Sequence, residues 1–161
     1  MHIFVDDQNL FWGLVNSRED RGYRVDIGRL SAAAVRKTGG IAREIGSAYV
    51  AGVIPDDDSF WEIWKNHNFE VNRGFLGHGK RSKQDDSFLV RDLTKTVCRE
   101  PGPSTIVLVA GDADYMPPLQ MAVEEGWRVE VLTIGRGVSS ALEPYTHEFR
   151  LIDEEEIRLY R

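Results

Sequence analysis

The segment at residues 105–119, TIVLVAGDADYMPPL, decides the fold that we predict for this chain. It begins with a continuous apolar run at residues 106–110, which is typical of a parallel strand covered on both faces. An acidic turn follows at 111–114, and the prolines at 117–118 fit only the first turn of a helix. The segment therefore predicts a central strand, an acidic turn and a helix that ends at Gly126.

The same alternation of strand and helix runs through the rest of the chain. Further strands are predicted at residues 2–5, 44–53, 69–76, 128–134 and 149–152. Helices are predicted to begin near residues 10, 26, 58, 85 and 139, with an acidic helical tail from residue 153. This pattern predicts a three-layer α/β/α sandwich with a mainly parallel central sheet, formed by a single domain over residues 1–161.

The composition is that of an ordinary globular protein with a modest negative charge. The formal net charge of −6 argues against a protein that coats nucleic acid indiscriminately, but 20 lysines and arginines leave room for a local basic groove. The single cysteine, Cys98, excludes an intrachain disulfide and a multi-cysteine zinc site. No charged-then-apolar leader or long apolar span is found at the N-terminus, so we expect a soluble cytoplasmic protein.

Carboxylates follow two of the predicted strands and open one of the predicted helices. Asp6 comes after the first strand and Asp112 after the central strand. Right-handed crossovers place these two strands side by side, so we expect Asp6 and Asp112 to emerge together. Asp86 lies on the inner stripe of its helix with Leu89 and Leu93. Each aspartate alone could be a helix cap, but three acidic helix starts at one sheet edge predict a shared site.

Several carboxylates at one sheet edge imply a bound cation. Anions crowded in a partly buried pocket repel one another, so such a cluster persists only when it is protonated or neutralised. Oxygen ligands favour Mg²⁺ or Mn²⁺, and the natural substrate is then a phosphodiester hydrolysed by metal-activated water. The sequence contains no Gly-x-Ser-x-Gly motif, which would position a serine as a protein nucleophile. Asn9, three residues after Asp6, carries an amide that could orient that carboxylate or hold a phosphate oxygen.

Three segments resemble the NYN domain, a PIN-like ribonuclease group that includes the bacterial LabA-type proteins. They are VDDQNL at 5–10, KQDDSFLVRDL at 83–93 and VAGDADYMPPL at 109–119, and the similarity spans nearly the whole chain. The positions that match the family motifs are Asp6, Asn9, Lys83, Asp86, Asp92, Gly111, Asp112, Asp114 and Tyr115. The residues that depart from the family pattern are Asp7 and Gln84, in place of glycine, and Ala110, in place of serine.

The resemblance implies a Mg²⁺- or Mn²⁺-dependent endoribonuclease. It implies Asp6, Asp86 and Asp112 as metal ligands, with Asp85 or Asp114 completing the shell through water. The pair Asp85 and Asp86 is also similar to the catalytic helix start of the CCCH zinc-finger endoribonucleases. The expected catalytic set is therefore Asp6, Asn9, Asp85, Asp86 and Asp112, and the expected metal ligands are Asp6, Asp86, Asp112 and Asp114.

An RNA substrate needs a surface that binds phosphates and bases. The basic candidates flanking the expected pocket are Arg73, Lys80, Arg81 and Lys83. Trp12 or Tyr115 could stack on an unpaired base of single-stranded or loop RNA. Two other functions stay open from the sequence: a different metal-dependent phosphoesterase, such as a DNA nuclease, and a non-catalytic RNA-binding or regulatory module. A homodimer or a protein partner is also compatible with the sequence.

Overall fold

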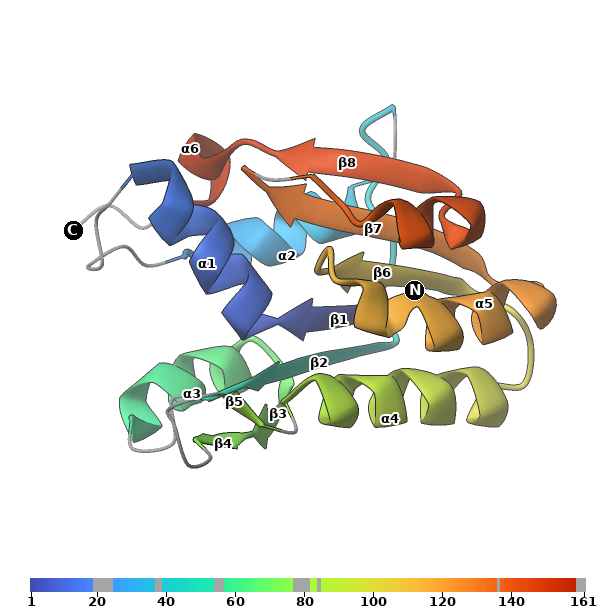
Figure 1. The fold of residues 1–161 in the computed structure, drawn as a ribbon, viewed down its shortest axis with the longest axis horizontal. Coiled ribbons are helices and arrows are strands. Elements are labelled where there is room, and N and C mark those ends of the chain that lie inside the picture. The colour runs from blue at the N-terminus through green and yellow to red at the C-terminus, as the bar shows by residue number, and fades with distance from the viewer. Residues whose placement is uncertain are drawn as a thin grey trace.

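The computed structural model describes residues 1–18, 25–36, 39–53, 57–76, 82–83, 85–135 and 137–158, except for the side chains of 14–18, 75–76, 82–83 and 85. Its centre is a sheet of six parallel strands in the order β3-β2-β1-β6-β7-β8 (Figure 1). The strands are β1 (His2–Asp6), β2 (Ser47–Gly52), β3 (Glu70–Arg73), β6 (Thr105–Val109), β7 (Arg128–Ile134) and β8 (Glu148–Ile152). The predicted α/β class with a parallel central sheet is confirmed.

Two hydrophobic core clusters join this sheet to its helices. One cluster contains side chains from α1 (Asp7–Arg18), α2 (Ile27–Val35), α3 (Asp58–Asn66) and α6 (Glu154–Ile157). The other contains side chains from α4 (Asp85–Arg99), α5 (Met116–Glu124) and the 3-10 helix η2 (Ser140–Tyr145), which lie in front of the sheet in Figure 1. Within the described residues, no helix has the length and apolar character needed to span a membrane.

Short-range signals in the sequence set the ends of several helices. The Asp26 carboxylate accepts a hydrogen bond from the main-chain N–H of Arg29 at 2.9 Å and so caps α2. Asp57 caps α3 in the same way, through the N–H of Phe60 at 3.0 Å. α5 is followed by Gly126, whose φ of +82° lies in the left-handed region that favours glycine. The predicted helix start at Asp26 and helix end at Gly126 are thus confirmed.

The predicted strand at 69–76 is wrong in its second half. β3 ends at Arg73, and the next residues form β4 (Phe75–Leu76), which pairs antiparallel with β5 (Ser82–Lys83) outside the main sheet. The break falls at Gly74, whose N–H donates to the carbonyl of the last residue of β2 at 2.6 Å. An apolar run of this length does not distinguish one strand from two short ones.

A buried ion-pair network ties the end of α2 to β7 and β8. Glu130 on β7 is fully buried and accepts hydrogen bonds from three arginines. Arg43 binds it with both terminal nitrogens, at 2.6 and 2.8 Å, while Arg128 Nε and Arg150 Nη2 lie at 3.1 and 3.0 Å. Arg43 and Arg150 also donate to the carbonyl of Ala34, one of the α2 carbonyls without an intrahelical partner. Arg43 and Arg150 therefore join helix and sheet through one carboxylate.

The arginines also set the protonation of Glu130. Burial alone would raise the pKa of Glu130, but hydrogen bonds from Arg43 and Arg128, together with the charges of Arg43 and Arg150, outweigh it. The pKa of Glu130 consequently lies below the ordinary glutamate value of 4.5. The carboxylate is ionised at neutral pH despite its burial.

Candidate active site

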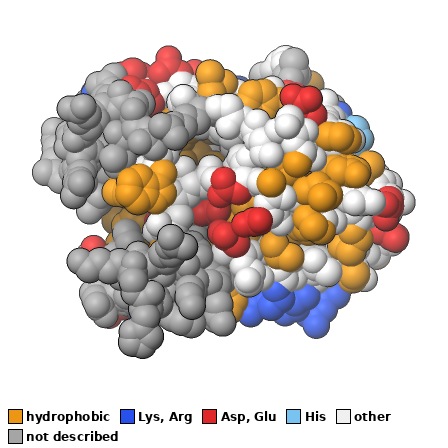
Figure 2. All heavy atoms as spheres, in the orientation of Figure 1, with side chains coloured by type: hydrophobic (Ala, Val, Ile, Leu, Met, Phe, Trp, Pro, Cys, Tyr) orange, Lys and Arg blue, Asp and Glu red, His pale blue; other side chains and the backbone are white. Residues whose placement is uncertain are grey.

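The pairing of β1 with β6 brings two acidic turns to the carboxyl edge of the sheet. Val5 lies opposite Val109, so Asp6 and Ala110, the next residues, stand side by side. Asp112 follows two residues later, directly before the 3-10 helix η1 at 113–115. Figure 2 shows acidic side chains gathered near the middle of this face, close to where β1 and β6 end in Figure 1. The predicted adjacency of these two strands is confirmed.

Asp6 is fixed at this edge by hydrogen bonds to both of its carboxylate oxygens. Its relative exposure is only 2%. Oδ1 accepts a hydrogen bond from the main-chain N–H of Asn9 at 3.0 Å, which is the bond that an N-cap residue of α1 makes. Oδ2 accepts from the hydroxyl of Tyr115 in η1 at 2.9 Å. Asp6 therefore both caps α1 and links β1 to the turn that follows β6.

The Tyr115 side chain does not have the role that the sequence suggested. We expected Tyr115 as one of two aromatic residues able to stack on an RNA base, but it is 0% exposed and belongs to the core. Its hydroxyl donates a hydrogen bond to Asp6. The sequence could not reveal this bond, because a tyrosine and an aspartate separated by 109 residues share no local pattern.

Asp112 and Asp114 differ from Asp6 in being exposed. Asp112 occupies the position that would cap η1, but its side chain makes no capping hydrogen bond. Neither carboxylate makes a hydrogen bond or ion pair with another described residue. The alternative that Asp112 serves as a helix cap is therefore excluded for η1.

Asp86 approaches the same region from a different element. It lies in the first turn of α4 and is half-buried, and α4 contacts β1, β2 and η1. Leu89 and Leu93 are both 0% exposed, which confirms the inner stripe that we predicted for this helix. Asp85 begins α4, but its side chain is outside the described part of the structure.

The described carboxylates do not form a complete metal centre. Among the side chains that the structure describes, no group of three or more His, Cys, Asp or Glu is placed to hold a metal ion. The donor chemistry at this edge nevertheless suits Mg²⁺ or Mn²⁺, because the acidic turns supply only carboxylate oxygens. The assignment of Asp6, Asp86, Asp112 and Asp114 as ligands stays a prediction.

Asp7 occupies a position where the family that the sequence resembles has glycine, and its side chain is buried. It is 6% exposed and packs close to Gly52 at the end of β2. A Cβ at Gly52 would lie 2.9 Å from the Asp7 Cβ and 2.8 Å from Trp61 Cη2, which is closer than a real contact allows. The glycine therefore makes room for Asp7 beside the acidic turn that follows β1.

Asp92, another residue that matches the family motifs, packs α4 against β3. It is 3% exposed and accepts hydrogen bonds from Asn72 Nδ2 at 2.6 Å and from Arg91 Nε at 2.9 Å. Arg91 Nη2 in turn donates to Asn72 Oδ1 at 2.8 Å, which closes a ring of three side chains. These contacts give Asp92 a structural role at this interface.

The structure describes only part of the expected RNA surface. Trp12 on α1 is 54% exposed, as a base-stacking residue must be. Arg73 forms an ion pair with Asp58 of α3 at 2.6 Å, so it is not a free cation. The remaining basic residues cannot be placed: Lys80 and Arg81 lie outside the described residues, and Lys83 is described in its main chain only.

The parallel sandwich, with acidic turns after two adjacent central strands, defines a PIN-like α/β domain. The family model of the NYN domain matches residues 1–153, and the chain belongs to this family. NYN membership implies the PIN-like nuclease superfamily.

Comparison with solved structures supports the same fold. A crystal structure of a protein of unknown function from Vibrio parahaemolyticus RIMD 2210633 is similar, with a TM-score of 0.74 and 21% sequence identity. The match covers 98% of this chain and 94% of that chain. At this identity the likeness concerns the fold alone. No curated protein matches the chain.

Proposed function

We propose that this NYN domain is a metal-dependent endoribonuclease that hydrolyses RNA phosphodiester bonds with activated water. Membership of the family supports a nuclease. The observation that carries the proposal is Asp112, an exposed carboxylate that follows the strand next to buried Asp6 and has no capping or ion-pair role among the described residues. A carboxylate without a structural role at the carboxyl edge of a parallel sheet is well placed to bind a ligand.

Asp6, Asp86 and Asp112 are the residues proposed to hold Mg²⁺ or Mn²⁺, with Asp85 or Asp114 contributing through water. The cation would lower the pKa of the attacking water and offset the charge that builds on the phosphoryl oxygens. Mg²⁺ commonly uses one or two protein carboxylates together with phosphates of the substrate. Because substrate phosphates would supply further ligands, we expect metal binding to be stronger when RNA is present than in the free protein.

The chain's own residues would orient the carboxylate and the RNA. Tyr115 and the main chain of Asn9 hold the two oxygens of Asp6 in a fixed direction, which limits the reorganisation needed when ligand binds. Trp12, exposed on α1, is proposed to stack on an unpaired base.

Phosphate binding is assigned to the basic residues around β4 and β5. We propose Lys80, Arg81 and Lys83 as the main contacts, since positive charges position the RNA backbone without reading its sequence. Arg73 is a weaker candidate, because binding to a phosphate would compete with its ion pair to Asp58. Contacts of this kind make binding fall steeply as the salt concentration rises.

Cleavage of labelled single-stranded oligonucleotides tests the assignment. Matched RNA and DNA of one sequence are incubated with the protein in Mg²⁺, in Mn²⁺ or in chelator. We expect RNA cleavage that requires the metal, and a loss of more than about 100-fold in Asp112→Asn. Glu143→Gln, which changes an exposed acidic residue of η2, is the matched control and should cleave normally. Normal cleavage by Asp112→Asn would remove Asp112 from the mechanism.

Metal binding can be followed without any cleavage. Mn²⁺ broadens the NMR signals of nearby amides, so titration should affect the residues around Asp6 and Asp112 first. Addition of the non-cleaved DNA oligonucleotide should tighten this binding if phosphates complete the ligand set. Asp112→Asn is expected to weaken it while leaving the unfolding free energy within about 0.5 kcal/mol of the wild type. Broadening centred elsewhere would contradict the proposed site.

A non-catalytic RNA-binding module is the second candidate. It is favoured by the departures from the family pattern at Asp7, Gln84 and Ala110. Salt-sensitive RNA binding with no cleavage in either metal would support this module over the nuclease. Equal cleavage of RNA and DNA would instead indicate a less selective metal-dependent phosphoesterase.

A further inference from the structure

Helix α4 carries three basic residues on its outer face, at intervals of four. Arg91, Lys95 and Arg99 are all exposed, whereas Leu89 and Leu93 pack inward. Residues four apart lie on one face of a helix, about 6 Å from each other along its axis. The three therefore form a continuous row, which we call the α4 basic stripe. The phosphate contacts predicted from the sequence do not include it.

Two members of the stripe carry a positive charge that no other described residue neutralises. The side chains of Lys95 and Arg99 form no hydrogen bond or ion pair with the part of the chain that the structure describes. After its first turn, α4 has only one acidic residue, Asp92, and this residue is 3% exposed. The net charge of the whole chain is −6, so the stripe is a local reversal of the protein's charge.

Arg91 contributes a fixed hydrogen-bond donor rather than free charge. Its Nε donates to Asp92 at 2.9 Å and its Nη2 donates to Asn72 at 2.8 Å, while the guanidinium carbon lies 5.1 Å from the centre of the Phe88 ring. The third nitrogen, Nη1, makes no hydrogen bond with any described residue. Its two N–H groups can therefore donate to a ligand without disturbing the other contacts.

The α4 basic stripe and the acidic turns lie on the same face of the molecule. Figure 2 shows Lys and Arg side chains gathered over α4 and the acidic side chains of the sheet edge above them. Asp86 lies in the first turn of α4, and Arg91 follows about 7.5 Å further along the helix axis. A nucleic-acid strand that passes the acidic turns can therefore continue along α4.

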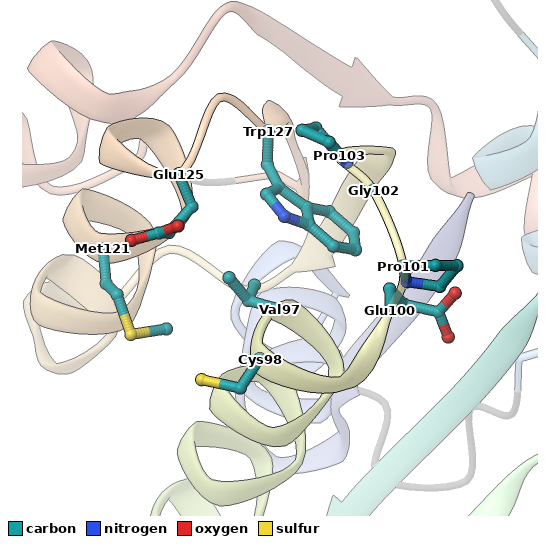
Figure 3. Close-up of a pocket in the computed structure, with 9 residues that line it drawn as sticks. All are labelled: Val97, Cys98, Glu100, Pro101, Gly102, Pro103, Met121, Glu125 and Trp127. Atoms are coloured by element: carbon teal, nitrogen blue, oxygen red, sulfur yellow. The ribbon is translucent and has the colours of Figure 1, made fainter.

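The stripe ends where α4 ends. Arg99 is the last residue of the helix, and Glu100, which follows it, forms no ion pair with any described residue. Figure 3 shows Cys98 and the Glu100 carboxylate on different sides of this helix end. Cys98 is exposed and lies three residues after Lys95, so it neighbours the stripe on the helix surface. As the single cysteine of the chain, it can report on what binds there.

We propose that the α4 basic stripe binds the phosphate backbone of RNA on one side of the cleavage site. The identity of the ligand rests on the proposed function. Lys95 and Arg99 would pair with phosphates, and Arg91 would donate from Nη1 to a phosphate nearer the acidic turns. Such contacts position a strand without reading its sequence. The interaction of a cation with the C-terminal end of a helix explains Arg99 alone, whereas a row of three matches a continuous backbone.

Fluorescence anisotropy in chelator measures RNA binding without cleavage. The probe is a labelled oligouridylate of about 20 nucleotides, longer than the usual single-strand site. Each phosphate contact adds about 0.7 to the salt slope, or about fivefold in affinity at 0.1 M salt. Lys95→Gln/Arg99→Gln should therefore bind about 25-fold more weakly and lower the slope by about 1.4. Unchanged binding by this double variant would overturn the proposal.

Two further double variants separate the stripe from a general effect of charge. Arg36→Gln/Lys65→Gln also removes two exposed cations, but these lie at the end of α2 and on α3. Because salt screens distant charges, this control should bind within about twofold of the wild type. Lys95→Arg/Arg99→Lys keeps both charges of the stripe and should bind normally. Equal weakening by Arg36→Gln/Lys65→Gln would overturn the assignment to α4.

Alkylation of Cys98 by N-ethylmaleimide locates the bound RNA. The reaction rate of the exposed thiol is measured with and without the oligouridylate for each protein. RNA should slow the reaction in the wild type and in Arg36→Gln/Lys65→Gln, but not in Lys95→Gln/Arg99→Gln at the same RNA concentration. RNA that binds the wild type without slowing this reaction lies elsewhere, which would overturn the proposal.

Cleavage in Mn²⁺ distinguishes failure of the stripe from failure of the nuclease assignment. If both proposals hold, Lys95→Gln/Arg99→Gln should raise KM for the long RNA and leave kcat unchanged. Protection of Cys98 by RNA without any cleavage would retain the stripe and refute the nuclease. Cleavage with an unchanged KM in the double variant would retain the nuclease and overturn the stripe.

Discussion

Replacing Glu130 with glutamine is expected to lower the unfolding free energy at pH 7 by about 3 kcal/mol. The buried carboxylate accepts four N–H bonds from three guanidinium groups. Glutamine keeps one acceptor oxygen but turns an NH₂ group toward donors, so about two of the four bonds are lost. Each hydrogen bond to a charged group contributes about 1.5–3 kcal/mol, which gives a gross loss of about 3–6 kcal/mol.

The loss of unfolding free energy should lie at the lower end of that range, because the three arginines are partly exposed to water. The side chains of Arg43, Arg128 and Arg150 are 16%, 39% and 21% exposed, so water recovers part of their lost solvation. The remaining cost of about 3 kcal/mol matches the lower bound for breaking a buried ion pair. In a chain of this length it corresponds to a fall in Tm of about 6–12 °C.

The effect of Glu130→Gln should depend on pH in a defined direction. The pKa of Glu130 is held below its ordinary value of 4.5 in the folded protein. A depressed folded-state pKa contributes stability that is complete above the unfolded-state pKa and is lost as the pH falls through the folded-state pKa. The difference between wild type and variant should therefore be constant from pH 6 to 8 and shrink below about pH 4.5.

Urea unfolding monitored by tryptophan fluorescence at pH 7 and pH 4 measures both effects. Glu70→Gln is the matched control, because Glu70 is exposed on a strand of the same sheet, and it should change stability by less than about 0.5 kcal/mol. A loss below about 1 kcal/mol for Glu130→Gln would refute the reasoning, since it would mean that the hydrogen bonds add nothing beyond hydration. A loss that persists unchanged at low pH would refute the assigned charge state.

Three smaller changes test other parts of the fold by the same unfolding assay. Tyr115→Phe removes the donor to Asp6 and should cost about 1 kcal/mol; a neutral effect would mean that this bond contributes nothing to stability. Gly52→Ala places a Cβ 2.8 Å from Trp61 and should cost about 1–3 kcal/mol through overpacking, whereas a stabilised variant would show that the site relaxes freely. Asp57→Ala removes the cap of α3 and should cost about 1 kcal/mol, and an unchanged midpoint would contradict that cap.

The central unit of the fold was predictable because its signals are local. The apolar run at 106–110 becomes fully buried, and the prolines and Gly126 mark the start and end of α5. The adjacency of β1 and β6 followed from a general rule of handedness rather than from any motif. Local sequence signals and the handedness rule were together sufficient to predict that Asp6 and Asp112 lie at the same edge of the sheet.

The partners of individual side chains were not predictable. Arg43 and Glu130 are 87 residues apart, and Tyr115 and Asp6 are 109 apart. No spacing rule links such pairs, because each depends on how complete elements pack. The prediction of one strand at 69–76 failed for a related reason. The chain leaves the main sheet after Gly74 because Phe75 pairs with Lys83, and no local pattern indicates that pairing.

Asp6 and Asp112 are consequently unequal as tests of function. Asp6 is buried, caps α1 and accepts the Tyr115 hydroxyl, so Asp6→Asn, which keeps only one acceptor oxygen, would disturb one of these two hydrogen bonds together with any metal binding. Loss of activity in that variant would have two sufficient causes. Asp112 is exposed and makes no hydrogen bond or ion pair with the described residues. A change in cleavage in Asp112→Asn at unchanged stability can therefore be attributed to chemistry at the sheet edge.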